Sequence, residues 1–219
     1  MNLIRVIFIL LACPKEIDIV LILDETTSIV AAPGGYDNWY GYILGFAAGF
    51  VNVFQVDPAF VRIGVIKFSS SARVVITLDQ YGDAASLVEA VRGLEIYGGE
   101  TNIAAGLRVG RSLLFNASLG ARVGAKKMAF LVTDGRANVE HDVTSTEVNI
   151  TKTAGVEIYC IGVTSMIDEV ELRNIASTPI STHYYFVTNY DLLNQVLGQL
   201  RGTICFALQI TTVAVSGKT

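Results

Sequence analysis

Six runs of consecutive apolar residues alternate with stretches in which apolar residues recur every three to four positions. The first pattern predicts buried β-strands and the second predicts helices. The predicted strands are Ile17–Leu23, Val61–Phe68, Arg73–Leu78, Lys127–Thr133, Val156–Val163 and Tyr184–Val187. The predicted helices are Asp37–Phe54, Asp83–Gly93, Asn102–Phe115, Asp142–Ala154, Ile167–Ser177 and Tyr190–Arg201. This alternation indicates an α/β fold with a mostly parallel sheet and helices on both faces.

The second and third predicted strands are joined by a short serine-rich segment, Ser69 to Ser71. A parallel connection needs a crossover of a dozen or more residues, so these strands should form an antiparallel hairpin. We therefore expect a doubly wound, Rossmann-like, six-stranded sheet with one antiparallel edge strand.

The segment Trp39–Val56 contains eighteen residues without a charge, and its glycines recur every fourth position from Gly41 to Gly49. Such a segment could span a membrane, with the glycines as a packing stripe. It could equally be a buried helix whose glycines let a strand approach closely. Asn52 and Gln55, together with the flanking strands, favour the buried helix over the membrane span.

Composition limits the possible partners. The chain has 219 residues, of which 52% are hydrophobic and 16% are charged, so one domain with a large core is expected. The net charge is −4 and the pI is about 5.2, and no basic cluster occurs. These values argue against a nucleic-acid partner.

The chain ends indicate secretion. Residues 1–12 resemble a short signal peptide, residues 13–205 form the predicted domain, and residues 206–219 form a tail or linker. Cys13 and Cys205 flank the domain, and a disulfide between them is expected because domain ends often lie close together. Cys160 lies in an apolar run and is expected to be a buried free thiol. Three reduced thiols in a cytosolic protein, or a lipoprotein anchor at Cys13, are the alternatives.

Two sequons also favour the secretory route, although such tripeptides arise by chance. Asn116 and Asn149 are the acceptors that they predict.

Five side chains with oxygen donors follow, or lie close to, predicted strand ends. They are Asp24, Thr26, Ser28, Thr101 and Asp134. Ligands bind at the carboxyl ends of parallel strands, and the glycines before Thr101 let its loop bend. Carboxylates and hydroxyls without soft ligands suit Mg²⁺, with Mn²⁺ or Ca²⁺ as alternatives. Helix caps and a turn would explain each residue singly, but the set together favours a cation site.

The segment Ile17–Ser28 resembles the opening of a von Willebrand factor type A domain, and Val132–Arg136 resembles its third metal loop. Gly99–Asn102 and Ala154–Val163 are similar to other parts of that family. The resemblance covers about residues 13–205 and is nearest to the extracellular-matrix branch, as in matrilins and some collagens. It implies metal roles for the five oxygen-bearing residues.

The resemblance also implies binding to an extracellular protein such as collagen, which would supply an acidic residue to an open metal position. The chain departs from the family pattern at Thr26, which replaces a serine, and at Thr27, which replaces a glycine. Thr27 is expected to stiffen the loop, and Glu25 is expected to place negative charge beside the site. A structural matrix-assembly domain with weak or no metal dependence is therefore the alternative function.

The sequence gives little support for an enzyme. Only His141 and His183 could serve a nucleophile as a base, and His141 is expected to be a solvated loop residue. No G-x-S-x-G motif, zinc-ligand spacing or G-x-G-x-x-G motif occurs. We therefore expect a secreted, non-enzymatic adhesion module of the extracellular matrix.

Overall fold

The computed structural model describes residues 16–54 and 56–202. The predicted signal peptide at 1–12, the proposed Cys13–Cys205 disulfide and the tail at 206–219 lie outside the described residues. These three predictions therefore remain predictions.

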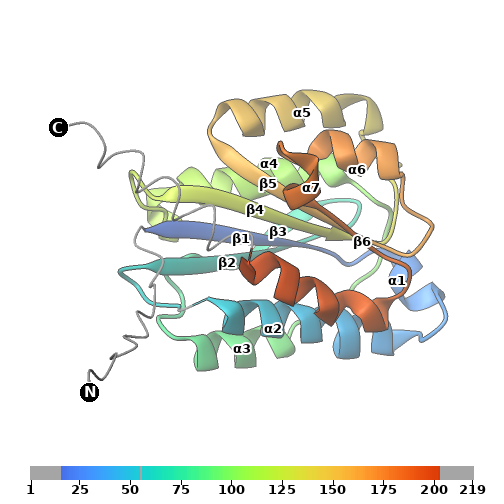
Figure 1. The fold of residues 1–219 in the computed structure, drawn as a ribbon, viewed down its shortest axis with the longest axis horizontal. Helices are drawn as coiled ribbons and strands as arrows, with labels where there is room; N and C mark the ends of the chain where they lie inside the picture. Colours follow the sequence, from blue (N-terminus) through green and yellow to red (C-terminus); the bar gives the residue numbers. More distant parts are fainter. Residues whose placement is uncertain (1–15, 55, 203–219) are drawn as a thin grey trace, which may run out of the picture.

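The predicted sheet is confirmed in its strand number, direction and edge hairpin (Figure 1). Its strand order is β3-β2-β1-β4-β5-β6. Every neighbouring pair is parallel except β2 and β3, which are antiparallel. The strands are β1 Ile17–Asp24, β2 Val61–Phe68, β3 Ala72–Ile76, β4 Lys126–Thr133, β5 Val156–Val163 and β6 Tyr184–Val187.

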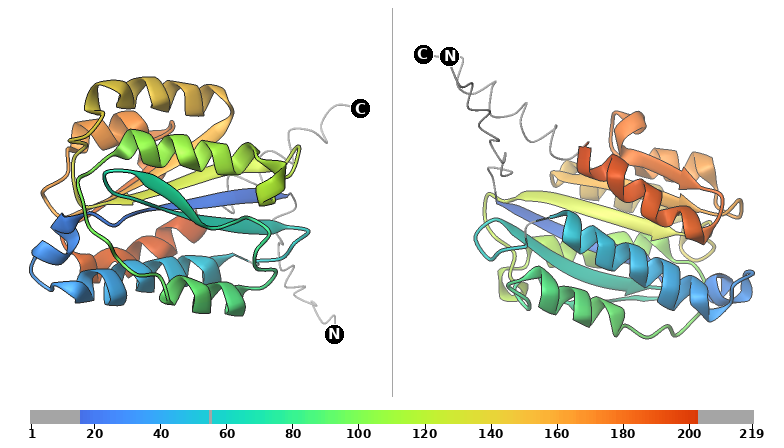
Figure 2. Two further views of the ribbon diagram at one scale, coloured as in Figure 1. Left: turned by 180° about the vertical axis from the view of Figure 1, so that it is seen from behind. Right: turned by 60° about the horizontal axis from the view of Figure 1, so that its bottom comes forward.

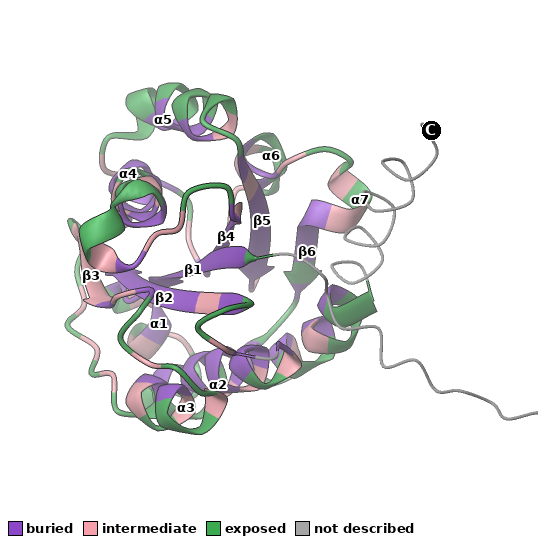
Figure 3. Cartoon of the chain, turned by 90° about the vertical axis from the view of Figure 1, so that its left-hand side faces the viewer, coloured by how far each residue is buried: buried purple, intermediate pink, exposed green. Residues whose placement is uncertain are grey.

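Helices cover both faces of the sheet (Figures 2 and 3). They are α1 Thr27–Ala31, η1 Asn38–Ile43, α2 Leu44–Val53, α3 Ala84–Arg92, α4 Ile103–Phe115, η2 Ala117–Leu119, α5 His141–Thr153, α6 Glu169–Ile175, α7 Ile180–His183 and η3 Tyr190–Leu192. A C-terminal helix follows at residues 193–202. One core cluster joins the sheet to α2, α3 and the C-terminal helix, and the other joins it to α4, α5 and α6.

The continuous apolar runs are explained by this double coverage. All eight residues of β1 are buried, because alternate side chains enter the two opposite cores. Cys160 in β5 is buried and free, as predicted.

The apolar segment Trp39–Val56 packs into the core, as the sequence favoured, although residues 40–42 are exposed, and it is not one uniform helix. It begins as the π-helix η1 and continues as α2. Phe46 and Phe50 are fully buried, and the Phe50 ring meets that of Phe130 in β4 at a centroid distance of 4.7 Å. Among the residues described, no helix has both the length and the apolar character needed to cross a bilayer.

The prediction that its glycines admit a strand is wrong. A Cβ added at Gly41 or Gly45 would meet no atom within 4 Å. A Cβ at Gly49 would lie 2.6 Å from Leu197 Cδ1, so the close neighbour is the C-terminal helix. Figure 1 shows that helix running beside α2.

This difference predicts that alanine will change the stability of the protein differently at two of these glycines. Gly45→Ala should raise the free energy of unfolding by about 0.5–1 kcal/mol, because alanine favours a helix and nothing obstructs its methyl group. Gly49→Ala should give no such gain, because Leu197 must move. Urea unfolding of both variants measures the difference, and equal stabilisation would contradict it.

Candidate metal centre

The candidate centre lies at the carboxyl ends of β1 and β4, the two central strands of the sheet. These strands are parallel neighbours, with Leu23 of β1 opposite Val132 of β4. Asp24 and Asp134 therefore leave the sheet side by side, and Figure 1 shows both strands pointing to the end where α1 begins. The prediction that these two strands are neighbours is confirmed.

The Asp24 carboxylate is fully buried and is held from two sides. Its Oδ1 accepts a hydrogen bond of 2.8 Å from the backbone N–H of Thr26. Its Oδ2 accepts one of 2.5 Å from the hydroxyl of Thr133, the last residue of β4. These bonds fix the carboxylate at the sheet edge.

The first loop is compact, because it leads directly into a short helix. Thr26 is the N-cap residue of the short helix α1, although its side chain makes no capping bond, and Ser28 lies in the first turn. The two hydroxyl oxygens are 2.8 Å apart, and the Ser28 hydroxyl donates to Asp134 Oδ1 at 2.7 Å. The helical turn thus brings both hydroxyls toward Asp134.

Thr101 approaches the same point from the loop before α4. Its N–H donates to Asn138 Oδ1 at 2.8 Å, which ties this loop to the one after β4. A Cβ at Gly135 would lie only 3.2 Å from the Thr101 hydroxyl oxygen, so glycine permits the close approach. Gly98 and Gly99 have φ values of 78° and 123°, which confirms that the loop needs glycine to bend.

The structure therefore brings together all five residues predicted as ligands. Four of them, Asp24, Thr26, Thr101 and Asp134, are buried, while Ser28 is partly exposed. Within the described part of the chain, no hydrogen bond or ion pair connects either aspartate to a lysine or arginine. Their role as ligands remains a proposal that rests on this geometry.

Two buried carboxylates without a cationic partner are electrostatically unfavourable. Burial, together with the charge of Asp134, raises the pKa of Asp24 to about 7. Burial also raises the pKa of Asp134, although bonds from Tyr190 and Ser28 oppose the shift. A divalent cation would remove both penalties, so the donor set fits a hard ion.

The donors of the centre are all oxygen atoms. Within residues 16–54 and 56–202, no three His, Cys, Asp or Glu side chains gather in a way that could hold a metal ion. A centre at this edge would therefore combine two carboxylates with neutral hydroxyls. That set is typical of Mg²⁺, which keeps several waters, and differs from sulfur- and imidazole-rich zinc sites.

The expectation that Glu25 places charge beside the site is wrong. Its side chain is fully buried and pairs with Lys67 at 2.9 Å and with Arg73. Lys67 also donates to the backbone carbonyl of Glu95. Glu25 therefore anchors the end of β1 to β2 and β3, and its charge is neutralised there.

Thr27 links the first loop to the second. Its hydroxyl accepts a bond of 2.9 Å from the Gly99 N–H, and its own N–H donates to the Gly99 carbonyl at 3.0 Å. A glycine here would lose the side-chain bond. This contact supports the expectation that Thr27 stiffens the loop.

The sequence did not indicate Tyr190 as a residue of the site. Its hydroxyl donates to Asp134 Oδ2 at 2.5 Å, and the residue is buried at the start of η3. The two residues are 56 positions apart, and no local pattern marks such a bond. Tyr190 thus connects the centre to the segment that leads into the C-terminal helix.

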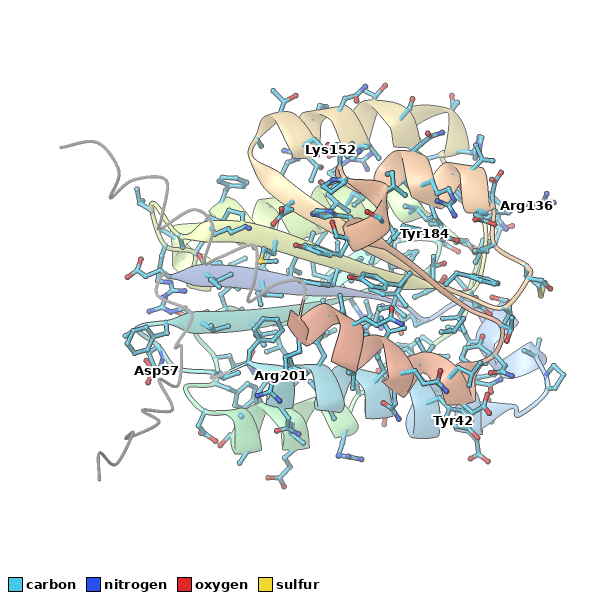
Figure 4. The ribbon with its side chains drawn as sticks, in the orientation of Figure 1. Tyr42, Asp57, Arg136, Lys152, Tyr184 and Arg201 are labelled. Atoms are coloured by element: carbon cyan, nitrogen blue, oxygen red, sulfur yellow. The ribbon has the colours of Figure 1, made fainter. Side chains whose placement is uncertain are left out.

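Removing this hydroxyl should destabilise the protein. Tyr190→Phe should cost about 1–2 kcal/mol in thermal or urea unfolding with chelator, because a buried carboxylate oxygen loses its donor. Tyr184→Phe is the matched control, because the buried Tyr184 hydroxyl has no hydrogen-bond partner within the described residues (Figure 4). Equal effects in the two variants would contradict a specific role for the Tyr190–Asp134 bond.

The other candidate residues lie away from this centre. His141 begins α5, its side chain is 64% exposed, and its ion-pair partner, Glu171, is 3.7 Å away. The histidine is solvated as expected, but it belongs to a helix and not to a loop. Asn116 and Asn149 are both exposed, and their glycosylation remains a prediction.

Known matrix proteins are similar to this chain in sequence. The family model for the von Willebrand factor type A domain matches residues 18–199. The chain is 30% identical over 190 residues to the collagen alpha-1(XII) chain of Notophthalmus viridescens, covering 87% of this chain and 19% of that one. It is 27% identical over 188 residues to matrilin-1 of Homo sapiens, covering 86% of this chain and 36% of matrilin-1. The chain thus spans only about a third or less of these relatives.

Solved structures show the same fold. Proximal thread matrix protein 1 from the mussel byssus, with zinc in its MIDAS motif, superposes with a TM-score of 0.81 at 22% identity, covering 89% of this chain and 49% of that one. The manganese-loaded TRAP protein of Plasmodium vivax superposes with a TM-score of 0.69 at 22% identity, covering 87% of this chain and 74% of the TRAP chain.

The matched segment includes every proposed ligand and all but the first residue of the sheet. The collagen and matrilin relatives confirm the matrix branch that the sequence resembled, and with it an extracellular location. The chain belongs to the von Willebrand factor type A domain family.

Proposed function

We propose that this chain is an extracellular adhesion module that binds a protein ligand through a divalent cation. Asp24, Thr26, Ser28, Thr101 and Asp134 would hold the ion directly or through water. When bound, the ion would supply a Lewis-acidic position for a carboxylate from outside. The partner is a matrix protein, for example a collagen, with an exposed acidic residue.

One observation carries this proposal. Asp24 and Asp134 are buried next to each other at a strand edge, and hydroxyls fill the space around them. Burying like charges without compensation is costly. A cation is the simplest compensation, and the hydroxyls add oxygen ligands without further charge, which leaves the ion electron-poor.

The relatives support the assignment. Two structural neighbours carry zinc or manganese, and matrix proteins recur among the curated relatives. Mg²⁺ is proposed because the donor set contains only hard oxygens, with Mn²⁺ and Ca²⁺ as the next candidates. The same relatives support a binding role without catalysis.

A structural assembly domain with weak metal dependence is the second candidate. It is favoured by the hydrogen bonds that already join Ser28 and Tyr190 to Asp134. These bonds hold the loops together without an ion, and the ion must displace at least part of them.

Two measurements separate the candidates. Calorimetric titration of chelator-stripped protein with Mg²⁺ or Mn²⁺ should show one site, which Thr101→Val should weaken while leaving the fold intact by circular dichroism. Solid-phase binding to fibrillar collagen and to a matrix extract should then require the cation. Ligand binding that persists in chelator would favour the assembly domain, and the absence of cation binding would refute the proposed centre.

A further inference from the structure

The loop that supplies Asp134 also carries an exposed and unpaired arginine, Arg136. It follows the aspartate by two positions. Among the described residues, it has no ion pair, hydrogen bond or ring contact, although the chain as a whole is acidic, with a net charge of −4. Figure 4 shows its side chain projecting from the end of the molecule where β1 and β4 end.

The backbone on both sides of Arg136 is held in place. The Gly135 N–H donates to the Thr133 hydroxyl at 3.2 Å, and the Ala137 N–H donates to Glu171 Oε2 at 3.1 Å. Ala137 itself is buried. The fold therefore fixes the Cα position of residue 136 and leaves its side chain free to meet a partner.

The neighbouring acidic residues are engaged with other groups. Glu140 of the same loop pairs with Arg108 at 2.9 Å, and Glu171 accepts from Ala137 and faces His141. Arg136 thus presents a guanidinium with all its donors available. A guanidinium binds a carboxylate through two parallel hydrogen bonds, which lysine cannot reproduce.

We propose that Arg136 binds a second carboxylate on the protein whose first carboxylate completes the metal centre. The favoured partner is then a segment with two nearby acidic residues. This inference rests on the proposed function, because it assigns a second contact on the same surface. Arg136 would set specificity between partners without binding the ion itself.

Capped peptides test the inference even though the natural partner is unidentified. Hexapeptides of glycine and serine, acetylated and amidated, would carry either one glutamate or two glutamates separated by one to three residues. Titration into ¹⁵N-labelled protein with saturating Mg²⁺ and about 50 mM NaCl measures weak dissociation constants by chemical shift. The best two-glutamate peptide should bind about two- to fivefold more tightly than the one-glutamate peptide, and higher salt should reduce this advantage.

The variants isolate the guanidinium. Arg136→Gln should make the two peptides bind equally, while Arg136→Lys should keep only part of the preference. Arg201→Gln is the matched control, because Arg201 is also exposed and unpaired within the described residues and lies away from the strand ends (Figure 4). It should leave the preference unchanged.

The outcomes distinguish this inference from the proposed function. Metal-dependent binding with no preference for two glutamates, or a preference that survives Arg136→Gln, would overturn the role of Arg136 and leave the metal centre standing. Peptide binding that is unaffected by chelator would count against the metal centre. Failure of every peptide to bind would refute the proposal that the partner presents two nearby carboxylates to this surface.

Discussion

Glu25→Gln should lower the free energy of unfolding by about 3–5 kcal/mol, because it breaks a buried ion pair by removing one partner. The change keeps the side-chain shape and removes one charge. Lys67, whose side chain is 2% exposed, then keeps a buried ammonium without its counter-charge. Burial already lowers the pKa of Lys67, and the hydrogen bond and charge of Glu25 oppose that shift.

Urea unfolding at 25 °C provides the measurement, with two accompanying variants. Glu100→Gln makes the same chemical change at an exposed residue without an ion pair among the described residues, and it should shift stability by less than about 0.5 kcal/mol. Glu25→Gln combined with Lys67→Met removes both charges and should recover at least half of the loss. A cost below about 1 kcal/mol for Glu25→Gln would show that this buried pair does not anchor the loop.

This prediction depends on a contact that the sequence could not reveal. The sheet was predictable because its strands are buried on both faces and therefore appear as continuous apolar runs, as in Ile17–Leu23. The hairpin was predictable because Ser69–Ser71 is too short for a crossover. Glu25 pairs with residues 42 and 48 positions away, and nothing in its neighbourhood distinguishes a buried ion pair from a solvated charge.

Some local conformations were also not predictable from the sequence, for similar reasons. The helix Thr27–Ala31 is a single short turn that begins with threonine and serine, which the pattern does not separate from a loop. The change from the π-helix η1 to the α-helix α2 has no proline or charge to mark it. The side-chain amide of Asn38 donates to the Ile29 carbonyl at 2.8 Å and ties the start of η1 to α1, a contact that the sequence pattern does not indicate.

The sequence predicted that the proposed ligands converge, but it did not predict the groups that hydrogen-bond to them. Strand ends fix where Asp24 and Asp134 lie, so parallel pairing alone brings them together. The groups that orient them are Thr133, Asn138 and Tyr190, and these act through bonds between separate loops. Such bonds depend on side-chain directions that only the folded arrangement specifies.

The second large effect is expected for Asp134→Asn. The variant should unfold less readily than the unmodified protein in chelator and more readily in Mg²⁺, so its change in the free energy of unfolding should reverse sign. At 100 times its dissociation constant, Mg²⁺ should stabilise the unmodified protein by about 2.7 kcal/mol, and the variant should lose this gain. In chelator near pH 7.5, the variant should be more stable than the unmodified protein by about 1 kcal/mol, because one of two buried like charges is gone.

The pH dependence has a defined direction. The pKa of Asp24 rises from 3.8 to about 7 on folding, so the folded state binds the extra proton between these values. In chelator, stability should therefore fall as pH rises from about 4 to about 7 and then level off. Mg²⁺ would bind the deprotonated carboxylates, so its stabilising effect should grow over the same range.

Thermal unfolding from pH 5 to 8, with EDTA or Mg²⁺, measures all three effects. Asp37→Asn is the matched control, because Asp37 is exposed and its side chain makes no capping bond. It should follow the unmodified protein at every pH. If Asp134→Asn keeps the Mg²⁺ gain, the ion does not bind at this strand edge. If the variant is less stable in chelator, the hydrogen bonds from Ser28 and Tyr190 outweigh the repulsion between the carboxylates, and the argument for a cation from electrostatic cost fails.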